Sequence, residues 1–142
     1  MAFTGNWACD TFKTGMMNGL YNFTSGTFYI ALYTNSAALN QTTTAYTSVG
    51  ETTGSGYTAG GQLLVVSQTP TTGTSGDTAY VSFNNAVWTG AISARGALIY
   101  LKNNTTNPAV CVLDFGSTKT SNGSFTVQFP ATTNTSAIIR IS

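Results

Sequence analysis

The sequence predicts a mostly β protein with a single-domain β-sandwich or jelly-roll-like fold of about seven or eight strands and one N-terminal helix. Two observations favour this fold. After residue 61, apolar segments of strand length recur at short intervals, separated by turns rich in Thr, Asn, Gly and Pro. Only 6% of residues are charged, against about 25% in an average globular protein. Thr, Ser and Asn must therefore make the surface polar, and Thr suits a half-exposed strand.

We expect one domain over residues 1–142. The length is that of an ordinary domain with a core of its own. No internal repeat, low-complexity tract or linker divides the chain, and 42% of its residues are hydrophobic, which argues against disorder.

The helix is expected at about residues 9–23. Apolar side chains recur there at spacings of three or four, which places them on one helical face. They are Cys9, Phe12, Met16, Leu20 and Phe23. Gly15 and Gly19 each weaken a helix by about 1 kcal/mol relative to Ala, so this helix needs a packing partner.

Seven or eight strands are expected after the helix. The first, at 27–34, is apolar on both faces, which predicts a strand that is covered on both sides. An Asn/Thr/Pro turn at 103–108 and the Asn122-Gly123 pair predict hairpins. The remaining strands are expected at 62–69, 78–83, 86–88, 94–102, 109–115, 124–129 and 137–141.

Between the first two strands, residues 35–61 lack periodicity and predict a long loop or arm. Segments of this length without regular structure usually have a function. We count only four apolar anchors, which are Leu39, Tyr46, Val49 and Tyr57. We therefore expect a segment that is mobile in the monomer and contacts other subunits, with Tyr46 and Tyr57 at the subunit interface.

The residue inventory argues against an enzyme. The chain has no histidine, which removes the commonest general base and zinc ligand. Its four acids are scattered, and a glycosidase pair built from Glu51 and Asp114 is a weaker hypothesis than structural roles for both. We expect no catalytic residue, no cofactor and no metal site. Arg95 lies in an apolar strand, where Glu51 or Asp114 is its expected partner.

Charge also bears on partners and compartment. A net charge of +1 from five scattered basic residues offers no patch for nucleic acid. The apolar runs are far shorter than the ~20 residues of a membrane span, and the N-terminus has no secretory pattern. Cys9 and Cys111 lack metal-site spacing and are expected as reduced, buried thiols.

Several segments together resemble a family of small structural proteins of tailed-phage particles. The similar runs are TFYIALYT at 27–34, GYTAGG at 56–61, WTG at 88–90, ARGALIY at 94–100, VLDFG at 112–116 and SFTVQFP at 124–130. The resemblance implies a virion component, and we favour a capsid decoration (cement) protein. Its partners would be the major capsid protein and copies of itself. It would lie on the outer capsid surface of the virion after assembly in the host cytoplasm.

The low charge fits a protein present in many symmetric copies. Each unpaired charge would be repeated around every symmetry axis and would repel its copies. A strand-rich fold can also bind a neighbour by adding a strand to an exposed sheet edge. Two other classes remain open: a phage tail, neck or fibre protein, and a carbohydrate-binding β-sandwich module.

Overall fold

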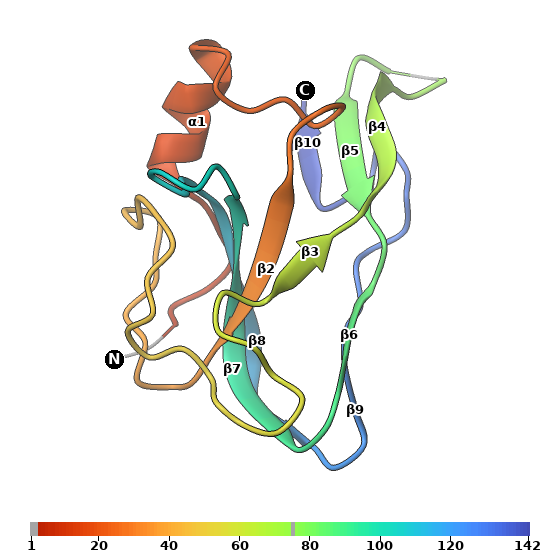
Figure 1. Ribbon diagram of the computed structural model, residues 1–142. Helices are drawn as coiled ribbons and strands as arrows, with labels where there is room; N and C mark the ends of the chain where they lie inside the picture. Colours follow the sequence, from red (N-terminus) through yellow and green to blue (C-terminus); the bar gives the residue numbers. More distant parts are fainter. Residues whose placement is uncertain (1–2, 75) are drawn as a thin grey trace.

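A computed structural model describes residues 3–74 and 76–142 (Figure 1). Within these residues it has one helix, α1 (Asp10–Met17), and ten strands. The strands are β1 (Trp7–Ala8), β2 (Phe28–Tyr33), β3 (Gln62–Leu64), β4 (Val66–Thr72), β5 (Ala79–Phe83), β6 (Ala86–Thr89), β7 (Ile92–Leu101), β8 (Ala109–Ser121), β9 (Ser124–Val127) and β10 (Ile139–Ile141). The predicted fold class, mostly β and sandwich-like with one N-terminal helix, is confirmed.

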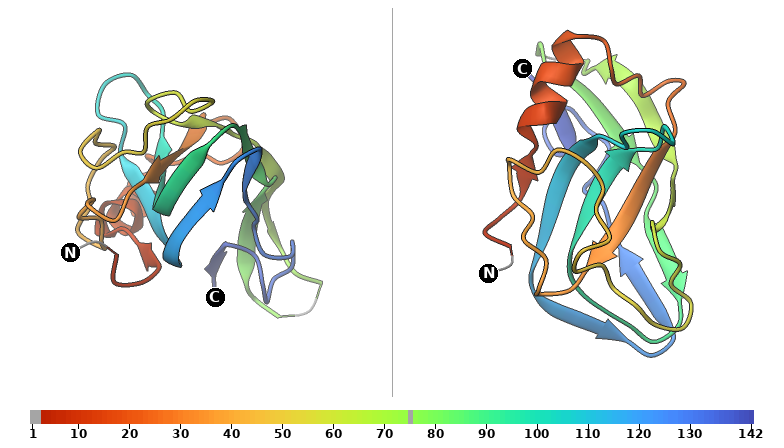
Figure 2. Two further views of the ribbon diagram at one scale, coloured as in Figure 1. Left: turned by 90° about the horizontal axis from the view of Figure 1, so that it is seen from below. Right: turned by 60° about the vertical axis from the view of Figure 1, so that its left-hand side comes forward.

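The strands form two layers, visible in Figures 1 and 2. The first layer is a five-stranded sheet in the order β1-β8-β7-β2-β3. The second layer consists of a three-stranded sheet, β10-β5-β4, and the pair β6-β9. Neighbouring strands are antiparallel throughout these sheets.

Six of the strands belong to one long antiparallel ribbon that folds over on itself. The chain through β5, β6 and β7 pairs successively with the chain through β8, β9 and β10, as β7·β8, β6·β9 and β5·β10. The ribbon crosses between the layers at Gly90, which lies between β6 and β7, and at Gly123, which lies between β8 and β9. There the Gly90 N–H donates to the Gly123 carbonyl (2.9 Å). This folded ribbon gives the structure its jelly-roll-like character.

The core lies between the layers and is rich in aromatic side chains. Phe28 of β2 stacks on Phe23, with ring centroids 4.5 Å apart, and both rings contact Phe83 of β5 in the other layer. Nearer the fold of the ribbon, Phe115 of β8 and Phe125 of β9 make a similar contact across the layers, 6.2 Å between centroids. These contacts fix the second layer against the first.

The helix is shorter than the sequence predicts. It ends at Met17 instead of residue 23, and Leu20, expected on its buried face, is 46% exposed. Gly19 has a φ of +73°, a left-handed conformation that terminates helices. Tyr21 then folds back over Gly15, where an added Cβ would lie 2.4 Å from the Tyr21 ring. The apolar spacing continues to Phe23 because this residue, like Tyr21, is buried in the core, although the chain there forms a turn and not a helix.

The 35–61 segment is better anchored than the sequence predicts. Ala37, Leu39 and Thr52 are buried, whereas Val49, which we counted as an anchor, is 72% exposed. Thr34 N–H donates to the Gly50 carbonyl (2.8 Å), and Thr52 N–H donates to the Leu32 carbonyl (2.9 Å). The segment covers the outer face of β2, so both faces of that strand are buried as expected.

Candidate functional site

The two predicted interface residues meet at one carboxylate. The Tyr46 hydroxyl donates to Oε2 of Glu51 (2.7 Å), and the Tyr57 hydroxyl donates to Oε1 (2.6 Å). The Gly60 N–H also donates to Oε1 (2.7 Å). The Tyr57 hydroxyl in turn accepts a hydrogen bond from the Leu32 N–H of β2 (2.9 Å). Glu51 therefore joins three parts of the 35–61 segment to the first sheet.

Two tyrosines from the sheet extend this group, which we call the Glu51 cluster. It comprises Glu51 with Tyr33, Tyr46, Tyr57 and Tyr100. The Tyr33 hydroxyl donates to the Thr47 carbonyl (2.6 Å), and the Tyr100 hydroxyl donates to the Gly60 carbonyl (2.6 Å). The rings of Tyr46 and Tyr100 stack at 5.0 Å. Each of the four hydroxyls thus donates within the chain.

The environment of the cluster keeps its phenols protonated. Burial, with the nearby Glu51 charge, raises the pKa of Tyr100 to about 12. The pKa values of Tyr33, Tyr46 and Tyr57 are also raised, first by burial and then by the interaction with Glu51. A neutral phenol donates to a carboxylate, whereas a phenolate beside it would be repelled. The cluster is therefore a fixed set of donors around one acceptor, with no base among its tyrosines at neutral pH.

The geometry gives Tyr46 and Tyr57 a role inside the monomer. Both side chains are half-buried and use their hydroxyls on Glu51. They hold the 35–61 segment in place, and the sequence pattern did not predict this structural role. Contact with other subunits stays a prediction for the exposed parts of the same segment.

A second carboxylate, Asp114, is the partner of Arg95, one of the two acids expected for it. The guanidinium donates to Oδ1 of Asp114 where β8 bulges away from β7, and both side chains are largely buried. The guanidinium also lies 5.7 Å from the centroid of the Phe3 ring. The pair, with the Phe3 ring beside it, links the N-terminal segment to β7 and β8. Asp114 is therefore engaged by Arg95, whereas Glu51 is engaged by Tyr46, Tyr57 and Gly60.

The other reactive side chains are dispersed. The described residues contain no group of three or more side chains able to hold a metal ion. Cys9 and Cys111 are both buried and free. Burial raises the pKa of Cys9 to about 11 and raises that of Cys111 further, so both thiols stay protonated at neutral pH. In the described part of the chain, no helix is both long and apolar enough to span a membrane.

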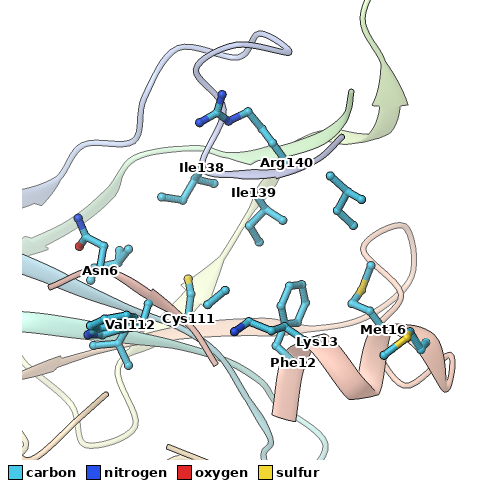
Figure 3. A pocket seen from close by; sticks show the side chains of 14 residues that line it. Asn6, Phe12, Lys13, Met16, Cys111, Val112, Ile138, Ile139 and Arg140 are labelled. Carbon is cyan, nitrogen blue, oxygen red and sulfur yellow. The ribbon is translucent and has the colours of Figure 1, made fainter. Parts of the chain in front are cut away.

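An open apolar cleft lies between the two layers and is shown in Figure 3. It has a volume of about 570 Å³ and lies between α1 and the β1–β8 edge on one side and β10 on the other. We call it the interlayer cleft. In Figure 3, Ile139 points from β10 towards Phe12 and Lys13, while the Arg140 guanidinium points away from them. Met17 and Ile141, two of its lining residues, are 82% and 54% exposed.

A smaller hollow lies at the opposite edge of the first sheet. Its volume is about 130 Å³, and it is formed by residues of β3, β6 and the chain between β5 and β6. Leu63, Val65 and Val87 line it and are each about half exposed. Most exposed large hydrophobic side chains thus gather at two separate edges of the sandwich.

Comparisons with protein-family models, with curated proteins and with solved structures found no match.

Proposed function

We propose that this protein is a non-enzymatic assembly component of a tailed-phage particle, and that within the particle it is a capsid decoration protein. In this role it binds the major capsid protein and copies of itself on the outer capsid surface, after assembly in the host cytoplasm. The resemblance in the sequence motivates the phage assignment. The observation that carries the assembly role is the pair of exposed apolar edges on a sandwich with few charged residues.

The two exposed apolar edges differ in shape, as is expected of a protein that contacts different neighbours in a repeating shell. One is the interlayer cleft beside β10, and the other is the β3–β6 edge with Leu63 and Val87. Apolar surface that is exposed in a monomer marks sites of association. Because the two edges have different shapes, each fits a different neighbour, as heterologous contacts in closed assemblies require.

The charged residues add to this picture. Three of the four carboxylates are engaged within the chain: Asp10 with Lys13 (3.0 Å), Asp114 with Arg95, and Glu51 in its cluster. The exterior is therefore mostly hydroxyl and amide. Such a surface avoids repulsion between copies and forms broad, wet contacts.

A tail, neck or fibre location is the alternative within the same class, and particle imaging separates the two. A carbohydrate-binding role has less support. A sugar-binding surface built from tyrosines would need free hydroxyls, whereas Tyr33, Tyr46 and Tyr57 of the Glu51 cluster donate theirs to groups of their own chain.

The test is attachment of the purified protein to particles of the phage that encodes it, stripped of their accessory proteins. We expect saturable binding on the shell, seen by co-sedimentation and by immunogold labelling. Leu63→Arg and Ile141→Arg place a charge at one edge each, at sites that are 55% and 54% exposed, so the fold should tolerate both. Labelling of the tail would favour the alternative, and no binding to any part of the particle would contradict the proposal.

A further inference from the structure

β10 has a free edge on the open side of the interlayer cleft. It is the terminal strand of the β10-β5-β4 sheet and, among the described residues, pairs only with β5. Free edges of this kind bind extended segments of other chains, because unpaired backbone N–H and C=O groups are available there. The cleft continues the same gap towards the β1–β8 edge of the other layer.

The side chains of β10 alternate in a way that specifies what such a segment contains. Ile139 points into the cleft, whereas Arg140 borders the cleft and its guanidinium points away from Phe12 and Lys13 (Figure 3). Ile141 follows the period of two and lines the cleft with Ile139. A strand laid beside β10 would place apolar residues opposite Ile139 and Ile141 and a third residue, on the outer face, opposite Arg140.

The residue opposite Arg140 is best a carboxylate. Arg140 is exposed, and its guanidinium donates to the Thr135 carbonyl (2.6 Å). Among the described residues it has no carboxylate partner, because the ion pairs there are Lys13–Asp10 and Arg95–Asp114. Three of the chain's four acids are already engaged within it, and the fourth, Asp77, lies between Gly76 and Thr78 and so lacks the apolar neighbours that the cleft requires. The charge therefore points to a different protein.

We propose that an extended segment of a partner protein, with a carboxylate between two apolar residues, adds to the free edge of β10 and fills the interlayer cleft. This deepens the proposed function, on which it rests only for the identity of the partner. The carboxylate sets the register by pairing with Arg140, and the apolar residues supply most of the affinity.

A tethered peptide tests the docking without any particle. An Asn-Gly turn, a Thr and the triplet Val-Asp-Val are appended to Ser142, so that Asp lies opposite Arg140 and the valines lie opposite Ile139 and Ile141. The tether raises the local concentration of a weakly binding segment into the millimolar range. Two matched tethers carry Val-Lys-Val, which reverses the charge, and Asp-Val-Asp, which inverts the alternation.

We expect the Val-Asp-Val tether to slow amide exchange of residues 139–141 about tenfold. Val-Lys-Val should be about threefold less effective, the scale of a cross-strand charge pair, and Asp-Val-Asp should be without effect. In Arg140→Glu the order of Val-Asp-Val and Val-Lys-Val should reverse. Ile141→Arg should abolish the protection, and Leu63→Arg should leave it unchanged. Equal protection by all three tethers, or none by any, would overturn the proposal.

Two further readouts separate this inference from its alternatives. Palmitate is the probe for a lipid occupant, and palmitate binding in the cleft that the Val-Asp-Val tether fails to prevent would overturn the proposal. On stripped particles, the Val-Asp-Val tether should weaken attachment at least tenfold, while Asp-Val-Asp should not. Attachment that persists with a docked tether would contradict the inference and leave the proposed function standing. Failure of the untethered chain to attach would instead contradict the proposed function.

Discussion

The Tyr57 hydroxyl donates to Glu51 at 2.6 Å while it accepts from the Leu32 N–H at 2.9 Å. This one hydroxyl links a loop carboxylate to the backbone of a central strand. With the matching bond from Tyr46, it explains how a segment of mostly Thr, Ser and Gly is held against the sheet without a helix or a long strand. The strength of that link sets the first prediction.

Glu51→Gln should destabilise the fold by about 2–3 kcal/mol. The substitution replaces one acceptor oxygen by an NH2 group, which leaves a donor facing a phenol or the Gly60 N–H. The free energy of unfolding, from urea titration, measures the loss. Asp77→Asn is the matched control, because it makes the same chemical change at an exposed turn and should cost less than about 0.5 kcal/mol. Equal effects of the two substitutions would show that the Glu51 bonds contribute nothing.

Stability should fall steeply at alkaline pH. Burial raises the pKa of Tyr21 and Tyr100 to about 12 and raises those of Tyr33, Tyr46 and Tyr57 as well. Above pH 10 the unfolded chain releases phenol protons that the folded chain retains, so the folded state binds more protons and loses stability as pH rises. Each such phenol contributes a slope of about 1.4 kcal/mol per pH unit.

Urea titrations from pH 8 to pH 12, with phenolate absorbance followed in parallel, check this dependence. We expect phenolate formation in the cluster to coincide with unfolding. The buried thiols act in the same direction, because the pKa values of Cys9 and Cys111 are also raised. A variant without cysteine removes the contribution of the thiols to the pH dependence of stability. Reversible ionisation of all seven tyrosines near pH 10 in a folded chain would contradict the buried cluster.

Gly61→Ala should be much more damaging than Gly116→Ala. Both glycines have similar positive φ values, +79° and +81°. At Gly61 an added Cβ would lie 1.8 Å from the Ile30 carbonyl oxygen, whereas nothing lies within 4 Å at Gly116. Gly116→Ala should cost about 1 kcal/mol of backbone strain, and Gly61→Ala should cost over about 3 kcal/mol. Thermal unfolding of both variants decides whether the loop approaches β2 as closely as described.

Cys9→Ala with Cys111→Ala should fold cooperatively, with a loss of about 1–3 kcal/mol. Both residues are buried and unbonded, so their contribution is packing. The native thiols should react with a thiol reagent only as fast as the protein opens. A double variant that fails to fold, together with a mass that shows two missing hydrogens in the native chain, would reveal a bond between them.

The sequence predicted the elements where local pattern and tertiary packing agree. The strand expected at 27–34 is observed at Phe28–Tyr33, and the strand pair around 103–108 is β7 and β8. The helix was overextended because Leu20 and Phe23 keep the helical spacing although Gly19 ends the helix. β8 continues to Ser121 instead of 115, because Gly116 at positive φ allows a bulge within a pairing that resumes at Lys119.

The site was harder to predict. Tyr46 and Tyr57 were noticed as aromatic residues in a polar loop, but nothing local shows that both would bind Glu51. That arrangement also depends on the sheet residue Tyr100, which is far away in sequence. The interlayer cleft was missed altogether, since it forms where α1 and β1 lie opposite β10, from the two ends of the chain. The apolar residues Ile139 and Ile141 on either side of Arg140 were the available signal.

A reconstruction of the particle of the encoding phage tests the central claim most directly. The account predicts density for this sandwich on the outer surface of the shell, with β10 and the interlayer cleft against an extended segment of a neighbouring chain. Density in the tail would reassign the protein within the virion. Complete absence of this chain from purified particles, by imaging and by mass spectrometry, would contradict the assembly role.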